Sequence, residues 1–200
     1  MQRVTTLLAL ALLWCGTLHA EPITLGQALP RLDIPQPGEI RLASSGEIHH
    51  APWSSGDLDS DSRIHILQYM AGRPAVERRV RHFAEALERL ELDASTYQLT
   101  SIVNLADVTL GASGLALREM EKNKPLHPRT ILVGDAEGRG RISWNLQPRN
   151  VALVILDREG RVAFFREGTL DDADTGHALA LITCLATNAL TQACSQFAEQ

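Results

Sequence analysis

Residues 63–76 read RIHILQYMAGRPAV and predict a strand, a turn and a helix start in direct succession. The isoleucine and tyrosine side chains in residues 63–70 favour a β-strand. The glycine in Ala71-Gly72-Arg73 suits a turn. Pro74 suits the first position of a helix, because the N–H that proline lacks would be unpaired there.

The residues after Pro74 predict an amphipathic helix. Its apolar side chains recur mostly in steps of three and four residues, which places them on one face of a helix. These side chains are Val76, Val80, Phe83, Ala84, Leu87 and Leu90. Further along, residues 97–103 and 129–133 predict two more strands, with a helix near residues 115–121 between them.

The C-terminal part of the sequence predicts a hairpin and a last helix. Residues 134–138 read as a turn, and residues 151–156 are all apolar, as in a strand buried on both faces. Residues 157–160 are turn residues that connect this strand to another at 161–166. Residues 169–172 offer N-cap side chains for a final helix.

This order of elements predicts the fold class. Strands that alternate with helices indicate βαβ units and a parallel core, and the hairpin adds an antiparallel edge. Residues 21–62, rich in Gly, Pro and Ser, contribute only short strand-like pieces such as 38–42. We therefore expect an α/β protein with a central mixed sheet flanked by helices, ending in two strands and a helix, which is the thioredoxin-like arrangement.

The composition is that of an ordinary globular protein. The chain has 200 residues, of which 44% are hydrophobic and 22% charged, so one domain with a packed core is expected. The formal net charge is −5, and the Lys and Arg residues are scattered. Nucleic-acid-binding surfaces normally carry a basic excess, so we expect no nucleic-acid partner.

The first twenty residues have the pattern of a cleavable signal peptide. Arg3 precedes an uninterrupted apolar run at residues 7–14, and Ala20 offers a small residue for cleavage before Glu21. The run is too short to span a bilayer. Trp14 stands before Cys15, where a lipoprotein signal requires a small residue. We expect residues 21–200 to form a single domain in the periplasm, without a membrane anchor.

Several stretches, in the same order, resemble the YtfJ family of bacterial periplasmic proteins, from about residue 26 to residue 185. They are Trp53-Ser54-Ser55, residues 66–73, residues 101–104 with Asp107, residues 121–124, Trp144-Asn145-Leu146 and residues 154–162. The resemblance implies a thioredoxin-like fold and a protein without a settled biochemical activity. Residues from about 187 onward extend beyond the family pattern.

The thioredoxin pattern also indicates one activity that this chain lacks. Thioredoxins carry a Cys-x-x-Cys pair at the turn after the first central strand, where the helix start lowers the thiol pKa. Here these four positions are Arg73-Pro74-Ala75-Val76. The position of the cis-proline that faces this pair is taken by Val151, unless a shift in register brings Pro148 there. We expect no thiol–disulfide oxidoreductase activity and no cofactor.

Three residues are candidates for a ligand site. Arg73 would lie at a helix N-terminus, where N–H groups and a guanidinium favour an anion or carboxylate. Alternatively, Arg73 pairs with a nearby carboxylate such as Glu77. Asn104 and Asp107 follow the strand at 97–103, at the edge where open α/β sheets bind ligands. Both residue types are equally at home in turns and caps.

The sequence thus predicts a binding module for a protein partner or a small ligand, because no activated nucleophile or paired carboxylates stand out. The alternative is a thiol-independent enzyme with a small pocket around the same three residues. His49-His50 lack a Cys or carboxylate at ligand spacing, so we predict no metal site.

Cys184 and Cys194 form an even pair in an oxidising compartment, which favours a disulfide. On one straight helix the two Cα atoms would be roughly 15 Å apart, too far for that bond. A disulfide therefore requires the helix to end between them, near Thr187-Asn188, and the chain to fold back. The rival possibility is a continuous helix with two separate thiols.

Overall fold

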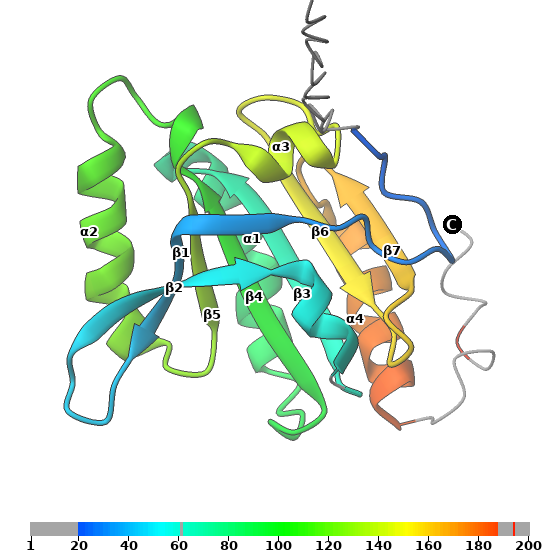
Figure 1. Cartoon of the computed structure of the whole chain (residues 1–200). Helices are drawn as coiled ribbons and strands as arrows, with labels where there is room; N and C mark the ends of the chain where they lie inside the picture. Colours follow the sequence, from blue (N-terminus) through cyan, green and yellow to red (C-terminus); the bar gives the residue numbers. More distant parts are fainter. Residues whose placement is uncertain (1–19, 61, 188–193, 195–200) are drawn as a thin grey trace, which may run out of the picture.

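A computed structural model describes residues 20–60, 62–187 and 194. Its seven strands form one sheet in the order β2-β1-β5-β4-β3-β6-β7 (Figure 1). The strands are β1 (Asp33–Leu42), β2 (Ile48–Ser54), β3 (Ile64–Ala71), β4 (Tyr97–Asn104), β5 (Ile131–Asp135), β6 (Val151–Leu156) and β7 (Val162–Glu167). The helices are α1 (Pro74–Glu88), α2 (Ser113–Asn123), α3 (Arg139–Ser143) and α4 (Asp172–Thr187), with 3-10 helices η1 (Ser55–Ser60), η2 (Leu105–Asp107) and η3 (Lys124–Leu126).

The sheet is mixed, as the sequence predicts. Strands β3, β4 and β5 run parallel, whereas β6 pairs antiparallel with β3 and forms an antiparallel hairpin with β7. Every residue of β3 is buried, which places this strand at the centre of the molecule. The predicted elements are all present, and β1 and β2 extend the sheet by an antiparallel pair in a region that showed only short strand-like pieces.

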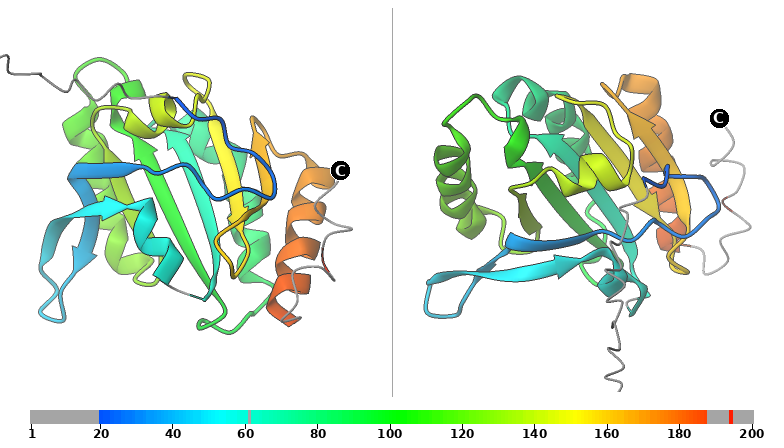
Figure 2. Two further views of the ribbon diagram at one scale, coloured as in Figure 1. Left: turned by 45° about the vertical axis from the view of Figure 1, so that its right-hand side comes forward. Right: turned by 45° about the horizontal axis from the view of Figure 1, so that its top comes forward.

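Helices α1 and α4 cover one face of the sheet. Phe83 of α1 and Ile182 of α4 are fully buried in one core, against β3 and β6 (Figure 2). The opposite face packs against the chain before β1, η1 and the residues that follow α3. Within the described part of the chain, no helix is long and apolar enough to cross a membrane.

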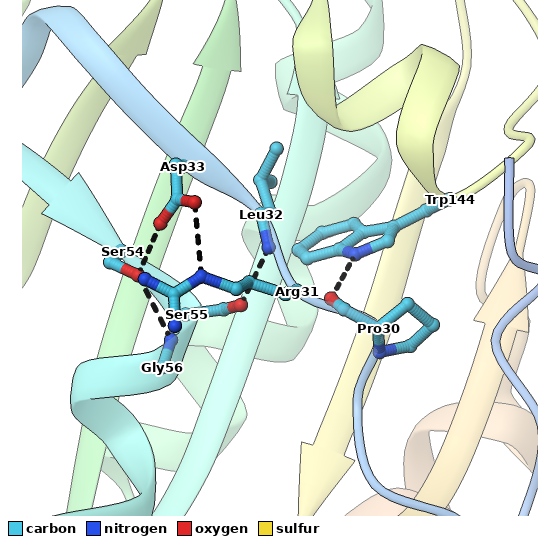
Figure 3. Close-up of polar contacts among 8 residues, drawn as sticks. All are labelled: Pro30, Arg31, Leu32, Asp33, Ser54, Ser55, Gly56 and Trp144. Carbon is cyan, nitrogen blue, oxygen red and sulfur yellow. Dashed lines mark hydrogen bonds and ion pairs between the residues drawn. The ribbon is translucent and has the colours of Figure 1, made fainter. Parts of the chain in front are cut away.

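A set of polar contacts fixes the start of β1 to the rest of the sheet (Figure 3). The Ser55 hydroxyl accepts the Leu32 N–H at 2.8 Å, and the Ser54 hydroxyl donates to Asp33 Oδ1 at 2.6 Å. From the other side, the Trp144 indole N–H donates to the Pro30 carbonyl at 2.9 Å. We call these contacts the N-terminal latch. Ser54, Ser55 and Trp144 all lie in stretches that suggested the family, and these contacts give them a structural role.

The predicted signal peptide lies almost wholly outside the described residues, which begin at Ala20. The backbone N–H of Glu21 donates to the Ser143 carbonyl at 2.8 Å, at the end of α3. Residue 21 is therefore already in contact with the folded domain.

The C-terminal cysteines lie in a geometry that suits a disulfide. The Cys184 and Cys194 Cα atoms are 5.8 Å apart, far less than the roughly 15 Å that a continuous helix would impose. Cys194 is 1% exposed and contacts the same core as Phe83. Most of residues 188–200 lie outside the described residues, and the bond itself stays a prediction.

Candidate functional site

The parallel strands end at one edge of the sheet, which we call the C-terminal edge. It comprises residues 71–74 after β3, 104–108 after β4, 135–143 after β5 and 147–150 before β6. In Figure 1 this is the end of the sheet at which α3 lies. Open α/β sheets bind ligands at this end, because the loops there diverge and leave backbone groups unpaired.

The three predicted site residues come together at this edge. Arg73 Nε donates a hydrogen bond to the Asp107 carbonyl oxygen. Asn104 Nδ2 donates to Asp107 Oδ2 at 3.1 Å, and the same oxygen accepts the backbone N–H of Arg149 at 3.1 Å. Asn104 is fully buried, and its Oδ1 accepts the Ala106 N–H at 3.0 Å. Asn104 therefore caps η2 and holds Asp107 in place.

Arg73 does not form the ion pair with Glu77 that the sequence offered as an alternative. Glu77 pairs with Arg81 at 3.2 Å, one helical turn further along α1. Arg73 itself is half-buried, and within the described residues its two Nη nitrogens have no hydrogen-bond partner. Its guanidinium is thus fixed at one nitrogen and open at two.

The turn that carries the redox pair in thioredoxins has the expected placement. Arg73 is the N-cap of α1 and Pro74 is its first residue. Met70 pairs with Val151, and the Ala71 N–H donates to the Asn150 carbonyl at 3.0 Å. This register leaves Pro148 in the loop before β6, and among the described residues the cis peptide bond is Gln36–Pro37.

Two further arginines contact loop residues at this edge, and we call them together with Arg73 the arginine cluster. Arg79 Nη1 donates to Asn150 Oδ1 at 3.2 Å, and Arg149 is exposed with a left-handed φ of 58°. Four carboxylates lie at the same edge. Asp107, Asp135 and Glu167 accept backbone N–H groups, and Glu137 pairs with Arg139. With Arg139 and Arg141 of α3 included, five arginines and four carboxylates leave this edge with one excess positive charge, on a chain whose net charge is −5.

Sequence reasoning missed a buried network beneath this edge. The Tyr69 hydroxyl donates to Asp135 Oδ2 at 3.0 Å and accepts the Arg141 N–H at 2.9 Å. Asp135 also accepts the N–H groups of Arg139 and Gly140, each at 2.9 Å. Burial, and then the charge of Asp135, raise the pKa of Tyr69 far above its usual value, so its hydroxyl stays a donor.

Gly140 has no side chain, and this leaves room for the Tyr69 ring of the network. A Cβ atom there would lie 2.3 Å from Tyr69 Cε2, well inside van der Waals contact. The sequence suggested only a turn at residues 134–138. The signal for α3 was the aspartate at the end of β5, which accepts the first N–H groups of that helix.

Lys124, at the opposite end of β5, is a second buried polar group with a structural role. Its Nζ donates to the carbonyls of Pro128 and Thr130, at 3.1 and 2.6 Å. Burial lowers the pKa of this ammonium group, and Glu39 partly opposes the change. Lys124 belongs to a stretch that suggested the family, and it holds the loop that enters β5.

One of the two histidines of β2, His50, contacts a carboxylate. His50 Nε2 lies 2.9 Å from Glu121 Oε1, which joins β2 to α2. In the part of the chain that the structure describes, no group of three or more His, Cys, Asp or Glu side chains is arranged to hold a metal ion.

The fold and the site define a thioredoxin-like protein whose redox turn carries Arg73 where a thioredoxin has a cysteine. The solved structures of two proteins support the fold. One, from Bacteroides thetaiotaomicron, is assigned as a protein disulfide isomerase, with a TM-score of 0.55, 17% identity, and coverage of 86% of this chain and 96% of that one. The other, from Chlorobium tepidum, is assigned as a thiol:disulfide interchange protein DsbE, with a TM-score of 0.54, 15% identity, and coverage of 83% and 99%.

Residues 23–185 match the model of a family described as bacterial protein of unknown function (YtfJ_HI0045), and the chain belongs to this family. An uncharacterized protein of Haemophilus influenzae is 25% identical over 185 residues, 92% of this chain and 99% of that protein. The uncharacterized protein YtfJ of Escherichia coli is 28% identical over 163 residues, 82% of this chain and 87% of that protein. The resemblance seen in the sequence is thus confirmed.

Proposed function

We propose that this protein is a periplasmic, thiol-independent binding module that holds a protein partner or a small ligand at its C-terminal edge. One observation carries the proposal. The half-buried guanidinium of Arg73 is anchored through Nε on the Asp107 carbonyl, and its two Nη nitrogens lack a partner among the described residues. Two such N–H groups in one plane match the two oxygens of a carboxylate.

The surroundings of Arg73 favour binding because they order the side chain in advance. Asn104 and the Arg149 N–H fix the Asp107 carboxylate, and the Asp107 carbonyl fixes Arg73. An arginine that is already held in place loses less conformational freedom when a ligand arrives. Arg79 and Arg149 add positive charge at the same edge without occupying the free nitrogens of Arg73.

The alternative, a thiol-independent enzyme at Arg73, Asn104 and Asp107, has less support. Asn104 uses both of its amide atoms within the protein, and the Asp107 carboxylate accepts two hydrogen bonds through one oxygen. Groups engaged in this way are poorly placed to move protons during a reaction. Their arrangement suits holding a loop in position.

The proposal predicts that Arg73→Gln lowers anion binding with little loss of stability. Arg73 is half-buried and forms one hydrogen bond to a backbone carbonyl, and such a bond typically contributes about 0.5–1.5 kcal/mol to stability. Thermal melts of the wild type and the variant, at rising sulfate concentration, measure both effects. We expect sulfate to raise the Tm of the wild type more than that of Arg73→Gln, because binding to the native state stabilises it.

The matched control for this measurement is Arg78→Gln. Arg78 is an exposed arginine of the same helix, so its loss changes the net charge equally. It should respond to sulfate as the wild type does. Equal Tm shifts in all three proteins, or a large loss of stability in Arg73→Gln without sulfate, would refute the proposed role of Arg73.

We also expect the protein to lack thiol chemistry at the redox turn, since residues 73–76 contain no sulfur. The purified chain, residues 21–200, should not reduce insulin disulfides in the presence of dithiothreitol faster than dithiothreitol alone. Thioredoxin serves as the positive control. Reduction above the background that disappears in Cys184→Ser would contradict this prediction.

The periplasmic location and the C-terminal disulfide can be tested on one sample. Protein isolated from the periplasmic fraction should begin at or within a few residues of Glu21 and carry no free thiol after denaturation without reductant. Mass spectrometry before and after thiol alkylation measures both. An intact Met1 or a lipid on Cys15 would disprove export by a cleaved signal peptide, and two alkylated thiols would disprove the Cys184–Cys194 bond.

A further inference from the structure

We infer that the C-terminal edge docks a protein partner through an acidic side chain that has aliphatic neighbours. The partner's carboxylate binds Arg73, and its aliphatic groups pack on Leu110 and Ile142. This inference rests on the proposed function and specifies its ligand. It places the site in the class of protein–protein docking surfaces, as opposed to small-anion sites.

Leu110 supplies the first apolar contact. It is fully exposed, at the tip of a turn closed by the Ala112 N–H on the Thr109 carbonyl at 2.9 Å. Gly111 follows with a φ of 79°, which a type II turn requires at that position. The turn therefore presents Leu110 to solvent by its backbone geometry, and burial of its side chain by a partner would be favourable.

The turn lies close to Arg73. Val108 is buried and packs against Gly72, where an added Cβ would lie 2.5 Å from Val108 Cγ1. Leu110 is three residues from Asp107, so their Cα atoms are at most about 11 Å apart. Asp107 in turn accepts the hydrogen bond of Arg73.

Ile142 supplies the second apolar contact, from α3. Its side chain is 44% exposed, and its N–H donates to the Gly138 carbonyl at 3.2 Å. Gly138, just before α3, packs against the loop that follows β4. A Cβ added at Gly138 would lie 3.2 Å from Asn104 Oδ1 and 3.4 Å from Ala106 Cβ. In Figure 1 and in the left view of Figure 2, α3 and the loop before α2 lie at the same end of the sheet.

Charge complementarity selects the partner. This edge has one excess positive charge, and each of its carboxylates is already engaged: Asp107, Asp135 and Glu167 accept backbone N–H groups, and Glu137 pairs with Arg139. An incoming carboxylate can form paired hydrogen bonds with Arg73, and aliphatic neighbours on the same partner would cover Leu110 and Ile142. Arginine is enriched in binding hot spots, and the contacts around such a residue serve to exclude water from it.

The experiment compares two peptides on the ¹⁵N-labelled chain of residues 21–200. The probes are acetyl-Ala-Leu-Glu-Leu-Ala-amide and its glutamine counterpart, with sodium acetate as the small anion, all at millimolar concentration. We expect the glutamate peptide to shift the amide signals of Arg73, Asp107 and Leu110, and to bind at least about fivefold more tightly than the glutamine peptide or acetate.

Variants test the carboxylate contact and the apolar contact separately. Arg73→Gln should weaken the glutamate peptide about tenfold, and Leu110→Ser about fivefold. Leu115→Ser, which removes a leucine of α2 that is 58% exposed, is the matched control and should bind as the wild type does.

Three results would overturn the inference. Equal affinity of Leu110→Ser and wild type, with binding still lost in Arg73→Gln, would leave a small-anion site and preserve the proposed function. Shifts from neither peptide nor acetate would remove both. Concentration-dependent dimerisation of the free chain that Leu110→Ser abolishes would assign this surface to a second copy of the chain.

Discussion

Asp135→Ala is expected to lower the free energy of unfolding by about 3–5 kcal/mol. The Asp135 side chain is fully buried and accepts hydrogen bonds from the N–H groups of Arg139 and Gly140 and from the Tyr69 hydroxyl. Alanine would leave these three donors without an acceptor in the interior. An unpaired buried donor costs about 1–3 kcal/mol, which is more than the net gain from making the bond.

Urea denaturation followed by circular dichroism measures this loss. Tyr69→Phe removes one donor and leaves the Arg141 N–H without an acceptor, so we expect a smaller loss of about 1–3 kcal/mol. Glu137→Ala removes a nearby exposed carboxylate that pairs with Arg139 at 2.8 Å, and should cost less than about 1 kcal/mol. A loss below 1 kcal/mol in Asp135→Ala would show that water or another group replaces the carboxylate.

The network also supports the candidate site. Asp135 fixes the start of α3, and Gly138 of the same loop packs against Asn104. We therefore expect Asp135→Ala, at temperatures where it remains folded, to weaken ligand binding without any contact to the ligand. This would be an indirect, positioning effect on the Asn104–Asp107 loop.

Trp144→Ala is expected to cost about 3–5 kcal/mol, the usual range for a buried aromatic side chain. Trp144 is 1% exposed and packs edge-on against Tyr69, with ring centroids 5.9 Å apart and an interplanar angle of 68°. Its indole N–H also closes the N-terminal latch on the Pro30 carbonyl (Figure 3). The substitution would open a cavity and release the chain before β1.

Trp144→Phe separates the two contributions. It keeps most of the packing and loses the hydrogen bond to Pro30, so about 1–2 kcal/mol is expected. Chemical denaturation should be followed by circular dichroism, because the substitution removes a fluorophore. A loss of less than about 1 kcal/mol in Trp144→Ala would show that the indole does not stabilise the fold.

The course of the chain could be predicted from the sequence because it depends on local patterns. The apolar steps from Val76 to Leu87 require only that a helix turns every 3.6 residues. Pro74 marks its first residue, because proline fits a helix start and disrupts an interior. The absence of the redox pair was equally visible, since residues 73–76 follow the β3 strand after a single glycine.

The cysteine pair shows where such local reasoning reaches its limit. The distance along a helix predicted that Cys184 and Cys194 cannot be bonded unless the chain folds back. The sequence left both possibilities open, and the 5.8 Å between the Cα atoms favours the one with the turn. Length and spacing exclude a geometry, but they do not choose among those that remain.

By itself, the sequence determined the order of strands and helices from β3 onward except α3, the turn without cysteines and the family. Only the tertiary structure decided that Arg73 contacts Asp107, 34 residues away, and leaves Glu77 to Arg81. The same holds for Tyr69 and Asp135, which lie 66 residues apart. Periodicity and capping act between neighbours within a few residues, whereas these contacts depend on which strands pair and in what register, and register is set by the packing of the whole sheet.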